Sequence, residues 1–584
     1  MTAEQTKIAE ESHVKAPWLN VYGVVPPHLD YPDCTIYEAV ERCAETYPNH
    51  TAYVFMGRKT TYRAMAAEID LCARALKATG VRPGDRITMA MPNCPQAVIM
   101  FYAINLVGAT ANMIHPLSSE KEIEFYLKES GSIFAVTLDQ FYHKFEAIRQ
   151  NVTLDNIILA SIPDALSKPV RVGYMLTEGR KQAKIPKDAP VLRWNEFLRR
   201  GRGYHWTYRA ERRAGDEAVI LYSGGTTGVT KGIQLTNLNF NALGKQIIAT
   251  NPMFRPGDKM LAVMPMFHGF GLGVSIHSML VSGGCCILVP RFTPDSYAKL
   301  LLKYRCNLIA GVPTLYEALL RLPKMKNADL SCLKGVYSGG DSLSVELNRR
   351  FDRCLCGLHA TIQVREGYGL TECVTASCLT PYHISREGSI GIPFPDTYYK
   401  IVEHGTQKEV PYGTEGEICL SGPTVMMGYL HHPEETAQTL QTHEDGLAWV
   451  HTGDLGSMDP DGFVYFRQRL KRMIVTSGYN VYPSQMENIL DAHELVQMSC
   501  VIGVPDPLKM QKVKAFVMLK PGVPANEETK AVLMAYIRKN VAKYALPYDI
   551  EFRAELPKTL VGKVAYRVLE EEELKKLSET AQEQ

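Results

Sequence analysis

Short apolar, strand-like runs alternate with longer helix-like segments along most of the chain. The apolar run at residues 86–92 precedes a helix-like segment at 95–108 and a second apolar run at 108–114. A similar order recurs around the apolar runs at residues 259–265 and 285–290. This alternation predicts an α/β fold, in which layers of mostly parallel sheet are covered by helices.

Two long stretches contain no Asp, Glu, Lys or Arg, at residues 87–119 and 260–290. Each is longer than the roughly 20 residues that a membrane-spanning helix needs. Both contain Pro, His and Gly, which favours strands and helices buried in a core over a lipid-exposed span. We therefore expect a soluble protein in which both stretches are buried.

The character of the sequence changes twice further along. Residues 152–214 are rich in Lys and Arg and lack a regular pattern, which predicts a solvated connector on the surface. Around residues 400–470, short strand-like runs are separated by frequent Gly, Pro and Asp. This spacing predicts a small antiparallel β unit.

A second α/β segment is predicted after about residue 472. It contains strand-like runs at residues 499–505 and 514–520 and a helix-like pattern near 527–541. A segment of this size can bury a core of its own. The strongly polar residues 570–584 are expected to form a frayed tail.

Charge and cysteine usage exclude several classes of function. The 64 Lys and Arg nearly cancel the 62 Asp and Glu, so the net charge of +2 gives no reason to expect a nucleic-acid partner. The 14 Cys include no Cys-x-x-Cys pair, which favours reduced thiols over a disulfide framework or a zinc knuckle. The amino terminus lacks the apolar segment of a signal peptide, so we expect a cytoplasmic protein.

A glycine-rich segment follows an apolar strand at residues 218–222. Its backbone N–H groups, hydroxyls and one ammonium group could bind phosphate oxygens, but a flexible turn explains the composition equally well. The segment is not a Walker loop, because Thr230 rather than Gly precedes Lys231. The positions concerned are Ser223, Gly224, Gly225, Thr226, Thr227, Gly228 and Lys231.

Further clusters with the same kind of chemistry follow in order. In residues 366–372, Tyr368 could stack on a base, and Glu372 could bind Mg²⁺ through oxygen. In residues 451–456, Asp454 on a tight turn could accept hydrogen bonds from two ribose hydroxyls. A basic run at residues 467–472 leads into a Gly turn, and Lys563 follows Gly562 near the end. Each cluster alone has an ordinary structural explanation, but their joint order does not.

Taken together, these motifs resemble the acyl-adenylate-forming superfamily of acyl-CoA synthetases, peptide-synthetase adenylation domains and luciferases. The resemblance extends from about residue 35 to residue 567 and is greatest to bacterial long-chain fatty acid–CoA ligases. The stretches that carry it are SGGTTGVTKG, EGYGLTEC, GSIGIPFPDT, VMMGYL and RMIVTSGYNVYPSQME.

The resemblance implies a two-domain architecture. Residues 1–470 would form a large N-terminal domain of α/β layers with a small β-barrel-like unit, which binds ATP and the acyl substrate. Residues 471–584 would form a small, mobile α/β domain that rotates about a hinge at Arg472 between two half-reactions.

The resemblance also implies roles for single residues. Thr371 would contact the α-phosphate, Glu372 would bind magnesium, and Lys563 would be the adenylation lysine. His268 would border the acyl pocket. The nucleotide-binding positions would be Ser223, Gly224, Gly225, Thr226, Thr227, Gly228 and Lys231 for the phosphates, Gly339, Gly340, Asp341, Gly367 and Tyr368 for adenine, and Asp454 with Arg469 for the ribose.

Some positions complete or depart from the family pattern. Gly478 and Tyr479 match a turn that helps to form the CoA tunnel. Thr230 stands where many members have Pro, and Gln468 replaces a common Gly. Arg472 stands where Asp or Lys is usual, and the SGGDSL segment at residues 338–343 weakens the adenine assignment of Asp341. None of these departures removes a group that the chemistry requires.

The expected function is that of an ATP-dependent fatty acid–CoA ligase of lipid metabolism, with Mg²⁺ as cofactor and CoA as a substrate. Alternatives are an acyl-AMP ligase that loads a carrier protein, a ligase for aromatic or medium-chain acids, and a non-catalytic nucleotide-binding protein. A lipid-like substrate is compatible with loose peripheral contact with the inner face of a membrane. The sequence leaves a homodimer open.

Overall fold

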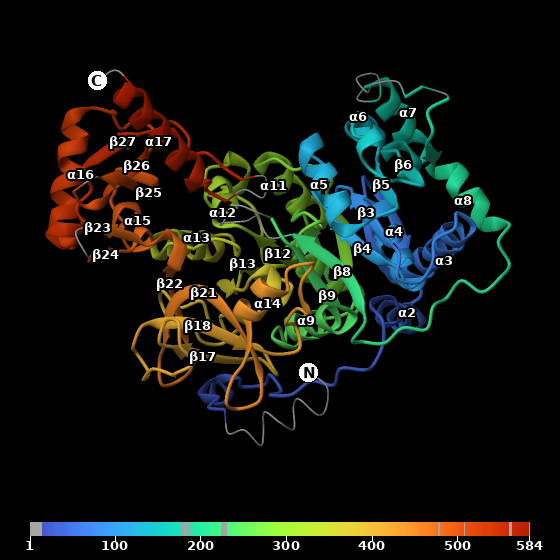
Figure 1. Cartoon of the computed structure of the whole chain (residues 1–584), viewed down its shortest axis with the longest axis horizontal. Helices are drawn as coiled ribbons and strands as arrows, with labels where there is room; N and C mark the ends of the chain where they lie inside the picture. Colours follow the sequence, from blue (N-terminus) through green and yellow to red (C-terminus); the bar gives the residue numbers. More distant parts are fainter. Residues whose placement is uncertain are drawn as a thin grey trace.

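The computed structural model describes residues 14–582 except 178, 180–184, 187, 223–229, 477–478, 507 and 560–562. Its strands form a nine-stranded, an eight-stranded and two five-stranded sheets. Figure 1 shows the first strands, in blue, at one end of the molecule and the last elements, in red, at the other. The predicted α/β fold with large N-terminal and small C-terminal parts is confirmed.

The eight-stranded sheet has the order β19-β9-β8-β4-β3-β5-β6-β7 and is parallel from β8 to β7. Strand β9 pairs antiparallel with β8. The strands are β3 (Arg86–Ala90), β4 (Thr110–Met113), β5 (Phe134–Leu138), β6 (Asn156–Ala160), β7 (Leu192–Arg193), β8 (Glu217–Tyr222), β9 (Gly232–Thr236) and β19 (Gly428–Tyr429).

The nine-stranded sheet has the order β16-β15-β14-β13-β12-β10-β11-β1-β2. Its central strands are parallel, so the carboxyl ends of β13 and β14 meet at one edge, where a ligand site is expected in such sheets. The strands are β1 (Thr51–Phe55), β2 (Arg58–Thr61), β10 (Lys259–Ala262), β11 (Cys285–Leu288), β12 (Leu308–Gly311), β13 (Gly335–Ser338), β14 (Val364–Tyr368), β15 (Cys378–Leu379) and β16 (Ile392–Pro393).

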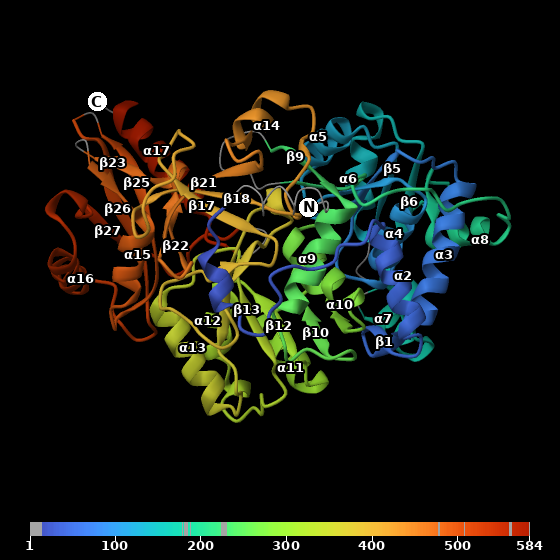
Figure 2. The ribbon, with the colours of Figure 1, turned by 90° about the horizontal axis from the view of Figure 1, so that it is seen from below.

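Helices cover both large sheets, as Figure 2 shows. They are α2 (Ile36–Thr46), α3 (Tyr62–Ala78), α4 (Pro95–Leu106), α5 (Glu120–Ser130), α6 (Tyr142–Ala147), α7 (Lys168–Leu176), α8 (Trp194–Arg202), α9 (Asn237–Ala249), α10 (Ser278–Leu280), α11 (Pro294–Tyr304), α12 (Pro313–Leu320) and α13 (Val345–Gly357).

The two uncharged stretches are largely buried, as predicted, although Leu117 and Ser119 at the end of the first are exposed. Every residue of α4 is buried, and the second stretch contains β10, the π-helix η6 (Phe270–His277), α10 and β11. Glycine is required at the start of this π-helix, because a Cβ atom on Gly269 would lie 1.6 Å from the backbone oxygen of Val374. Within the described part of the chain, no helix combines the length and apolar character needed to cross a bilayer.

The prediction of an irregular surface connector at residues 152–214 is correct only for its last part, residues 203–213, which have no helix or strand and are exposed or half-buried. In the earlier part, strands β6 and β7 extend the eight-stranded sheet, and α8 packs its Trp194 and Phe197 into the core. The charges that suggested a solvated loop lie on the opposite side of α8, where Arg199 and Arg200 are exposed. The apolar positions were too sparse among these charges to indicate a buried face.

The predicted small antiparallel unit is present as a five-stranded sheet of order β17-β18-β21-β20, with β22 also pairing with β21. The sheet is open: the described strands do not close it into the barrel-like unit that the family resemblance implied. The elements are β17 (Tyr398–Val402), β18 (Gly416–Ser421), β20 (Leu440–Thr442), β21 (Ala448–Met458), β22 (Val464–Arg469) and α14 (Pro433–Thr439).

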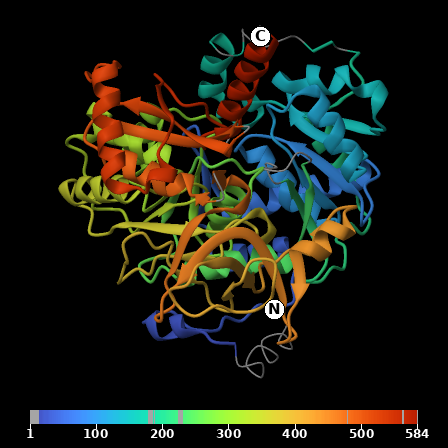
Figure 3. The ribbon, with the colours of Figure 1, turned by 60° about the vertical axis from the view of Figure 1, so that its left-hand side comes forward.

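The C-terminal part has its own five-stranded sheet and a separate apolar core. Figure 3 shows these red segments above the orange antiparallel sheet. The elements are β23 (Ile474–Thr476), β24 (Tyr479–Val481), β25 (Val496–Asp506), β26 (Met510–Leu519), β27 (Asp549–Phe552), α15 (Pro483–Asp491), α16 (Glu527–Asn540) and α17 (Tyr566–Gln582).

The predicted frayed tail is instead part of helix α17. Leu569 is fully buried, and Glu573, one helical turn later, pairs with Lys514 of β26 at 2.8 Å. A side chain at each end of one helical turn thus holds α17 against the sheet. The polar composition concealed this narrow packed face.

Candidate active site

A cavity of about 1470 Å³ lies where the two large sheets, the antiparallel sheet and the C-terminal part meet. Residues from all four contribute to its walls, so folding of the whole chain is needed to form it. Of the residues that the sequence singled out, those that line the cavity are Thr230, Lys231, His268, Gly340, Thr371, Glu372, Arg469 and Lys563.

Asp454 of β21 is held between two predicted partners. Tyr368, at the end of β14, donates its hydroxyl to Asp454 Oδ2 at 2.7 Å, and Arg469 Nε lies 3.2 Å from Asp454 Oδ1. Arg469 is the register partner of Asp454 on β22. Burial raises the pKa of the Asp454 carboxyl, while Arg469 and Tyr368 favour its charged form. Its Oδ1 accepts no hydrogen bond from the described residues and can accept one from a ligand.

Glu372 lies on a short turn, η8 (Thr371–Cys373), directly after the end of β14. Tyr429 of β19 donates its hydroxyl to Glu372 Oε1 at 2.8 Å. The ammonium group of Lys231 lies 3.3 Å from Glu435 Oε1 and 5.1 Å above the centre of the Tyr429 ring. A carboxylate oxygen and an ammonium group therefore lie on either side of one tyrosine, in a wall of the cavity.

The loop after β13 and the end of β14 approach each other closely. A Cβ atom on Gly339 would lie 3.1 Å from the backbone oxygen of Gly367, and Gly340 has a φ of +84°, which favours glycine. Asp341, the next residue, is exposed. Its side chain accepts a hydrogen bond from the backbone N–H of Ser342 at 3.0 Å. Glycine at these positions therefore allows the two backbone segments to pack closely together.

Glu366 is a site residue that the sequence reasoning missed. Its carboxylate accepts the backbone N–H of Leu343 at 3.1 Å and thereby ties the loop after β13 to β14. Burial raises the pKa of Glu366 to about 8. Its position directly before the Gly-Tyr-Gly sequence was the available signal.

Lys563 enters the cavity from the C-terminal part. A Cβ atom on Gly340 would lie 3.5 Å from Lys563 Cε, so the lysine side chain runs along the glycine backbone. Burial lowers the pKa of Lys563 and nearby Arg469 lowers it further, whereas Asp341 and Asp454 act in the opposite direction. Burial, with Lys563 nearby, also lowers the pKa of His268 to about 3, so this imidazole is neutral at physiological pH.

A smaller cavity of about 30 Å³ adjoins the large one, since Gly340 and Thr375 line both. Apart from the glycines, most of its lining is apolar and includes Phe270 and Val274 of the π-helix η6. The π-helix belongs to the second uncharged stretch, which also contains His268, the residue expected to border the acyl pocket.

The predicted hinge and CoA positions lie elsewhere. Arg472 forms an ion pair with Glu487 of α15 and lies 4.8 Å above the centre of the Tyr566 ring, so its contacts are within the C-terminal part. Tyr479 is 56% exposed and stacks on Tyr544 with ring centres 4.4 Å apart. Gly478 lies outside the described residues, as do Ser223, Gly224, Gly225, Thr226, Thr227 and Gly228 of the predicted phosphate loop.

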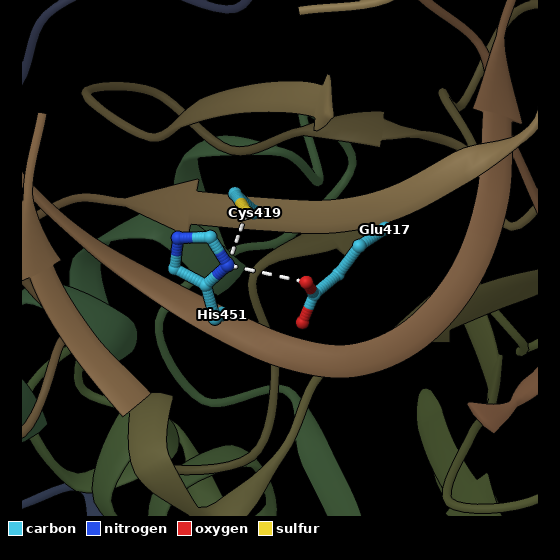
Figure 4. Close-up of side chains that lie close together, drawn as sticks. All are labelled: Glu417, Cys419 and His451. Carbon is cyan, nitrogen blue, oxygen red and sulfur yellow. Dashed lines mark hydrogen bonds and ion pairs between the residues drawn. The ribbon is translucent and has the colours of Figure 1, made fainter. Parts of the chain in front are cut away.

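A second group of functional side chains was not predicted. Glu417 and Cys419 of β18 face His451 of β21, and their ligand-type atoms lie within 4.8 Å of one another (Figure 4). His451 Nδ1 lies 3.2 Å from Glu417 Oε2 and 3.5 Å from Cys419 Sγ. His451 stands three residues before Asp454 and could have been noticed, but Glu417 is close to it only through the strand pairing.

Comparisons with known proteins identify relatives over nearly the whole chain. The chain is 36% identical over 565 residues to a long-chain-fatty-acid–CoA ligase of Bacillus subtilis (strain 168), covering 95% of this chain and 98% of the relative. The crystal structure of the anthranilate CoA ligase AuaEII in complex with anthranoyl-AMP aligns with a TM-score of 0.80 at 26% identity, covering 93% of this chain and 97% of that one.

MatB from Rhodopseudomonas palustris, 26% identical, aligns with a TM-score of 0.78 in its ATP-bound crystal structure and 0.71 in its apo structure, each covering 92% of this chain and 99% of that one. Residues 40–430 match the family model of the AMP-binding enzymes, and residues 485–563 match the model of the AMP-binding enzyme C-terminal domain. With both halves matched and a nucleotide-sized cavity between them, the chain belongs to the AMP-binding enzyme family.

Proposed function

We propose that this protein is an ATP-dependent fatty acid–CoA ligase that forms acyl-CoA through an acyl-adenylate. The observation that carries the proposal is that Glu372, Lys231 and Lys563 line one cavity although they come from different parts of the fold. Asp454 is buried next to this cavity, where it contacts the lining residue Arg469. These groups supply a magnesium ligand, a ribose acceptor and two cations. The Bacillus subtilis relative supports the choice of fatty acid and CoA as substrates.

In the first half-reaction, a carboxylate oxygen of the acid attacks the α-phosphorus of ATP, the bond to the β-phosphate breaks, and pyrophosphate leaves. Carboxylate and triphosphate repel each other, so cations must hold them together. Lys231 and Lys563 supply positive charge in the cavity wall, and the lowered pKa of Lys563 does not prevent it from donating hydrogen bonds. Thr371, which also lines the cavity, would orient the α-phosphate.

Mg²⁺ fits this set of residues. Tyr429 contacts only Oε1 of Glu372, which leaves carboxylate oxygen available, and oxygen is the donor that this ion prefers. When bound, Mg²⁺ would neutralise phosphate charge. Glu372 is the residue that would hold it.

In the second half-reaction, the CoA thiolate attacks the acyl carbonyl carbon and AMP leaves. The proposed adenylation lysine lies in the cavity, while Tyr479 of the proposed CoA turn is exposed on the outside. The higher TM-score to ATP-bound MatB than to its apo form supports an arrangement suited to the first step. Rotation of residues 471–584 about Arg472 would then move Lys563 out of the cavity and bring Tyr479 towards it.

The acyl chain would extend from His268 into the smaller apolar cavity. Each buried CH₂ group contributes about 0.8 kcal/mol, so an apolar tunnel suffices to select long chains. In the described arrangement the space of about 30 Å³ is too small for such a chain, so Phe270 and its neighbours would have to move when a substrate enters.

A specific observation favours a second candidate. AuaEII, a structural neighbour, is an anthranilate CoA ligase, so an aromatic acid is the second candidate substrate. The test is CoA-dependent AMP release with a panel of acids from acetate to oleate that includes anthranilate. We expect the highest kcat/KM with long-chain acids; a maximum at anthranilate would overturn the fatty acid assignment.

The same assay distinguishes the two possible acyl acceptors, CoA and a carrier protein. If CoA is the acceptor, AMP release depends on CoA; if a carrier protein is loaded instead, CoA has no effect although pyrophosphate exchange proceeds.

We also propose a cytoplasmic location with loose peripheral contact with membranes, and a homodimer. Vesicle sedimentation and the mass in solution test these two proposals.

A further inference from the structure

The cluster of Glu417, Cys419 and His451 lies beside an irregularity in the antiparallel sheet (Figure 4). Cys419 pairs with His451, whereas Glu417 pairs with Leu455. Between these two pairs, β21 runs from His451 to Leu455, whereas β18 runs only from Cys419 to Glu417. Strand β21 therefore contains more residues than β18 over the same length of sheet. The extra residues of β21 form a bulge, and such bulges redirect side chains next to active sites. Asp454 stands on this bulge.

The bulge is held by hydrogen bonds from β18. Gly453 has a φ of +67°, and its backbone N–H, which is excluded from the ladder, donates to Glu417 Oε1 at 2.9 Å. The hydroxyl of Thr452 donates to the backbone oxygen of Ile418 at 2.6 Å and accepts the N–H of Asp454 at 3.1 Å. The Glu417 carboxylate thus fixes the residue directly before Asp454.

A buried carboxylate needs a partner of its own, and His451 provides one. Glu417 is 5% exposed, and its second oxygen, Oε2, lies 3.2 Å from His451 Nδ1. His451 Nε2 lies 3.0 Å from His443 Nε2, and the His443 ring stacks on Trp449 with centres 5.5 Å apart. One continuous chain of contacts therefore connects the sheet core through His443, His451 and Glu417 to Gly453.

We infer that His443, His451 and Glu417 form a positioning chain that sets the bulge and presents Asp454 to the nucleotide ribose. This inference rests on the proposed function, because Asp454 is a ribose acceptor only if the cavity binds a nucleotide. Glu417 and His451 also line the cavity. The role assigned to all three residues is a positioning one, exerted through Gly453. Both Glu417 oxygens have hydrogen-bond partners in the chain, so the contacts among these groups do not require a metal ion.

The experiment measures the Kd for AMP by calorimetry, with no acyl substrate present. We expect Glu417→Ala to weaken AMP binding roughly 10-fold to 100-fold, as loss of a hydrogen bond to a charged group does. Glu417→Gln keeps an oxygen for the Gly453 N–H and should lose less affinity than Glu417→Ala. The matched control is Arg386→Gln, which breaks ion pairs to Asp459 and Asp461 just beyond β21 without touching the bulge.

Two substitutions of His451 give a readout that a merely structural role would not produce. The Asn amide nitrogen can take the place of Nδ1, which faces Glu417, whereas the Gln amide reaches the place of Nε2, which faces His443. We expect His451→Asn to bind AMP within about 3-fold of the wild type and His451→Gln to lose about 10-fold or more. Thermal unfolding of each variant confirms that the folded protein is measured.

Several results would overturn the inference: wild-type affinity in Glu417→Ala, equal losses in Arg386→Gln and Glu417→Ala, or equal losses in the two His451 variants. A stoichiometric metal ion in the purified protein, with AMP binding lost on chelation, would also overturn it. If the wild type binds AMP and the variants behave as expected but no carboxylate is activated, the proposed function fails while the positioning chain stands. If the wild type does not bind AMP, both fail.

Discussion

The side chain of Lys563 lies along the backbone of Gly340, so that a Cβ atom at Gly340 would come within 3.5 Å of Lys563 Cε. The two residues belong to the C-terminal part and to the loop after β13, respectively. Their contact places the only predicted catalytic group of the C-terminal part in the cavity formed by the rest of the chain. The proposed adenylation step needs this lysine there.

Replacement of Asp454 by Asn should weaken ATP binding by roughly 10-fold to 100-fold, because hydrogen bonds to a carboxylate contribute about 1.5–3 kcal/mol. Tyr368→Phe should cost less, since it keeps the ring and removes only the 2.7 Å hydrogen bond to Asp454. The KM for ATP of each variant tests this order. A larger loss in Tyr368→Phe than in Asp454→Asn would contradict it.

Glu372→Ala should raise the magnesium concentration needed for half-maximal adenylation by about 10-fold or more, because loss of a carboxylate ligand weakens metal binding strongly. The control is Glu434→Ala, an exposed position on α14. Titration of pyrophosphate exchange with magnesium measures the effect. Magnesium dependence that is the same in both variants would remove Glu372 from the proposed site.

The raised pKa of Glu366 predicts a dependence of stability on pH. Because this pKa is about 8 in the folded chain and near 4.5 ordinarily, the folded state binds more protons than the unfolded state between these values. The free energy of unfolding should therefore fall as pH rises through this window. Glu366→Gln removes the titration, so its Tm relative to the wild type should increase between pH 6 and pH 9. As a control, Glu444→Gln replaces an exposed carboxyl, and its Tm should change with pH in the same way as the Tm of the wild type.

Arg472 and Glu487 are expected to stabilise the C-terminal part together. Their side chains are 20% and 16% exposed, so removing one leaves a partly buried charge unpaired. Allowing for solvent screening, Arg472→Ala should lower the free energy of unfolding by about 1–3 kcal/mol. Urea unfolding of both single variants and the double variant measures the coupling. Additive effects would show that the ion pair contributes nothing.

The candidate site illustrates what a sequence can and cannot predict. Asp454 could be predicted because a Gly-Asp turn has a local signature, and the structure brings Tyr368 to it from 86 residues away. Glu417 could not, because its contact with Gly453 depends on a bulge whose register is set by pairing between β18 and β21. A local sequence pattern does not indicate which strands pair or in which register they pair.

The errors in the fold have a similar cause. The alternation of apolar runs predicted the parallel sheets, and the uncharged stretches were correctly expected in the core. Helices α8 and α17 were missed because each presents only a narrow packed face, through Phe197 and Leu569 respectively, among many charged residues. A few buried contacts outweigh a polar composition once the partner surface is available.

The most direct test of the account is to measure the two half-reactions of Lys563→Ala separately. We predict that fatty acid-dependent pyrophosphate exchange falls on the order of 100-fold or more, as loss of one charge-stabilising group does. Thioester formation from supplied acyl-adenylate and CoA should stay within about 3-fold of the wild type, and the exposed control Lys539→Ala should be unchanged in both. Equal loss of both half-reactions in Lys563→Ala would contradict the account.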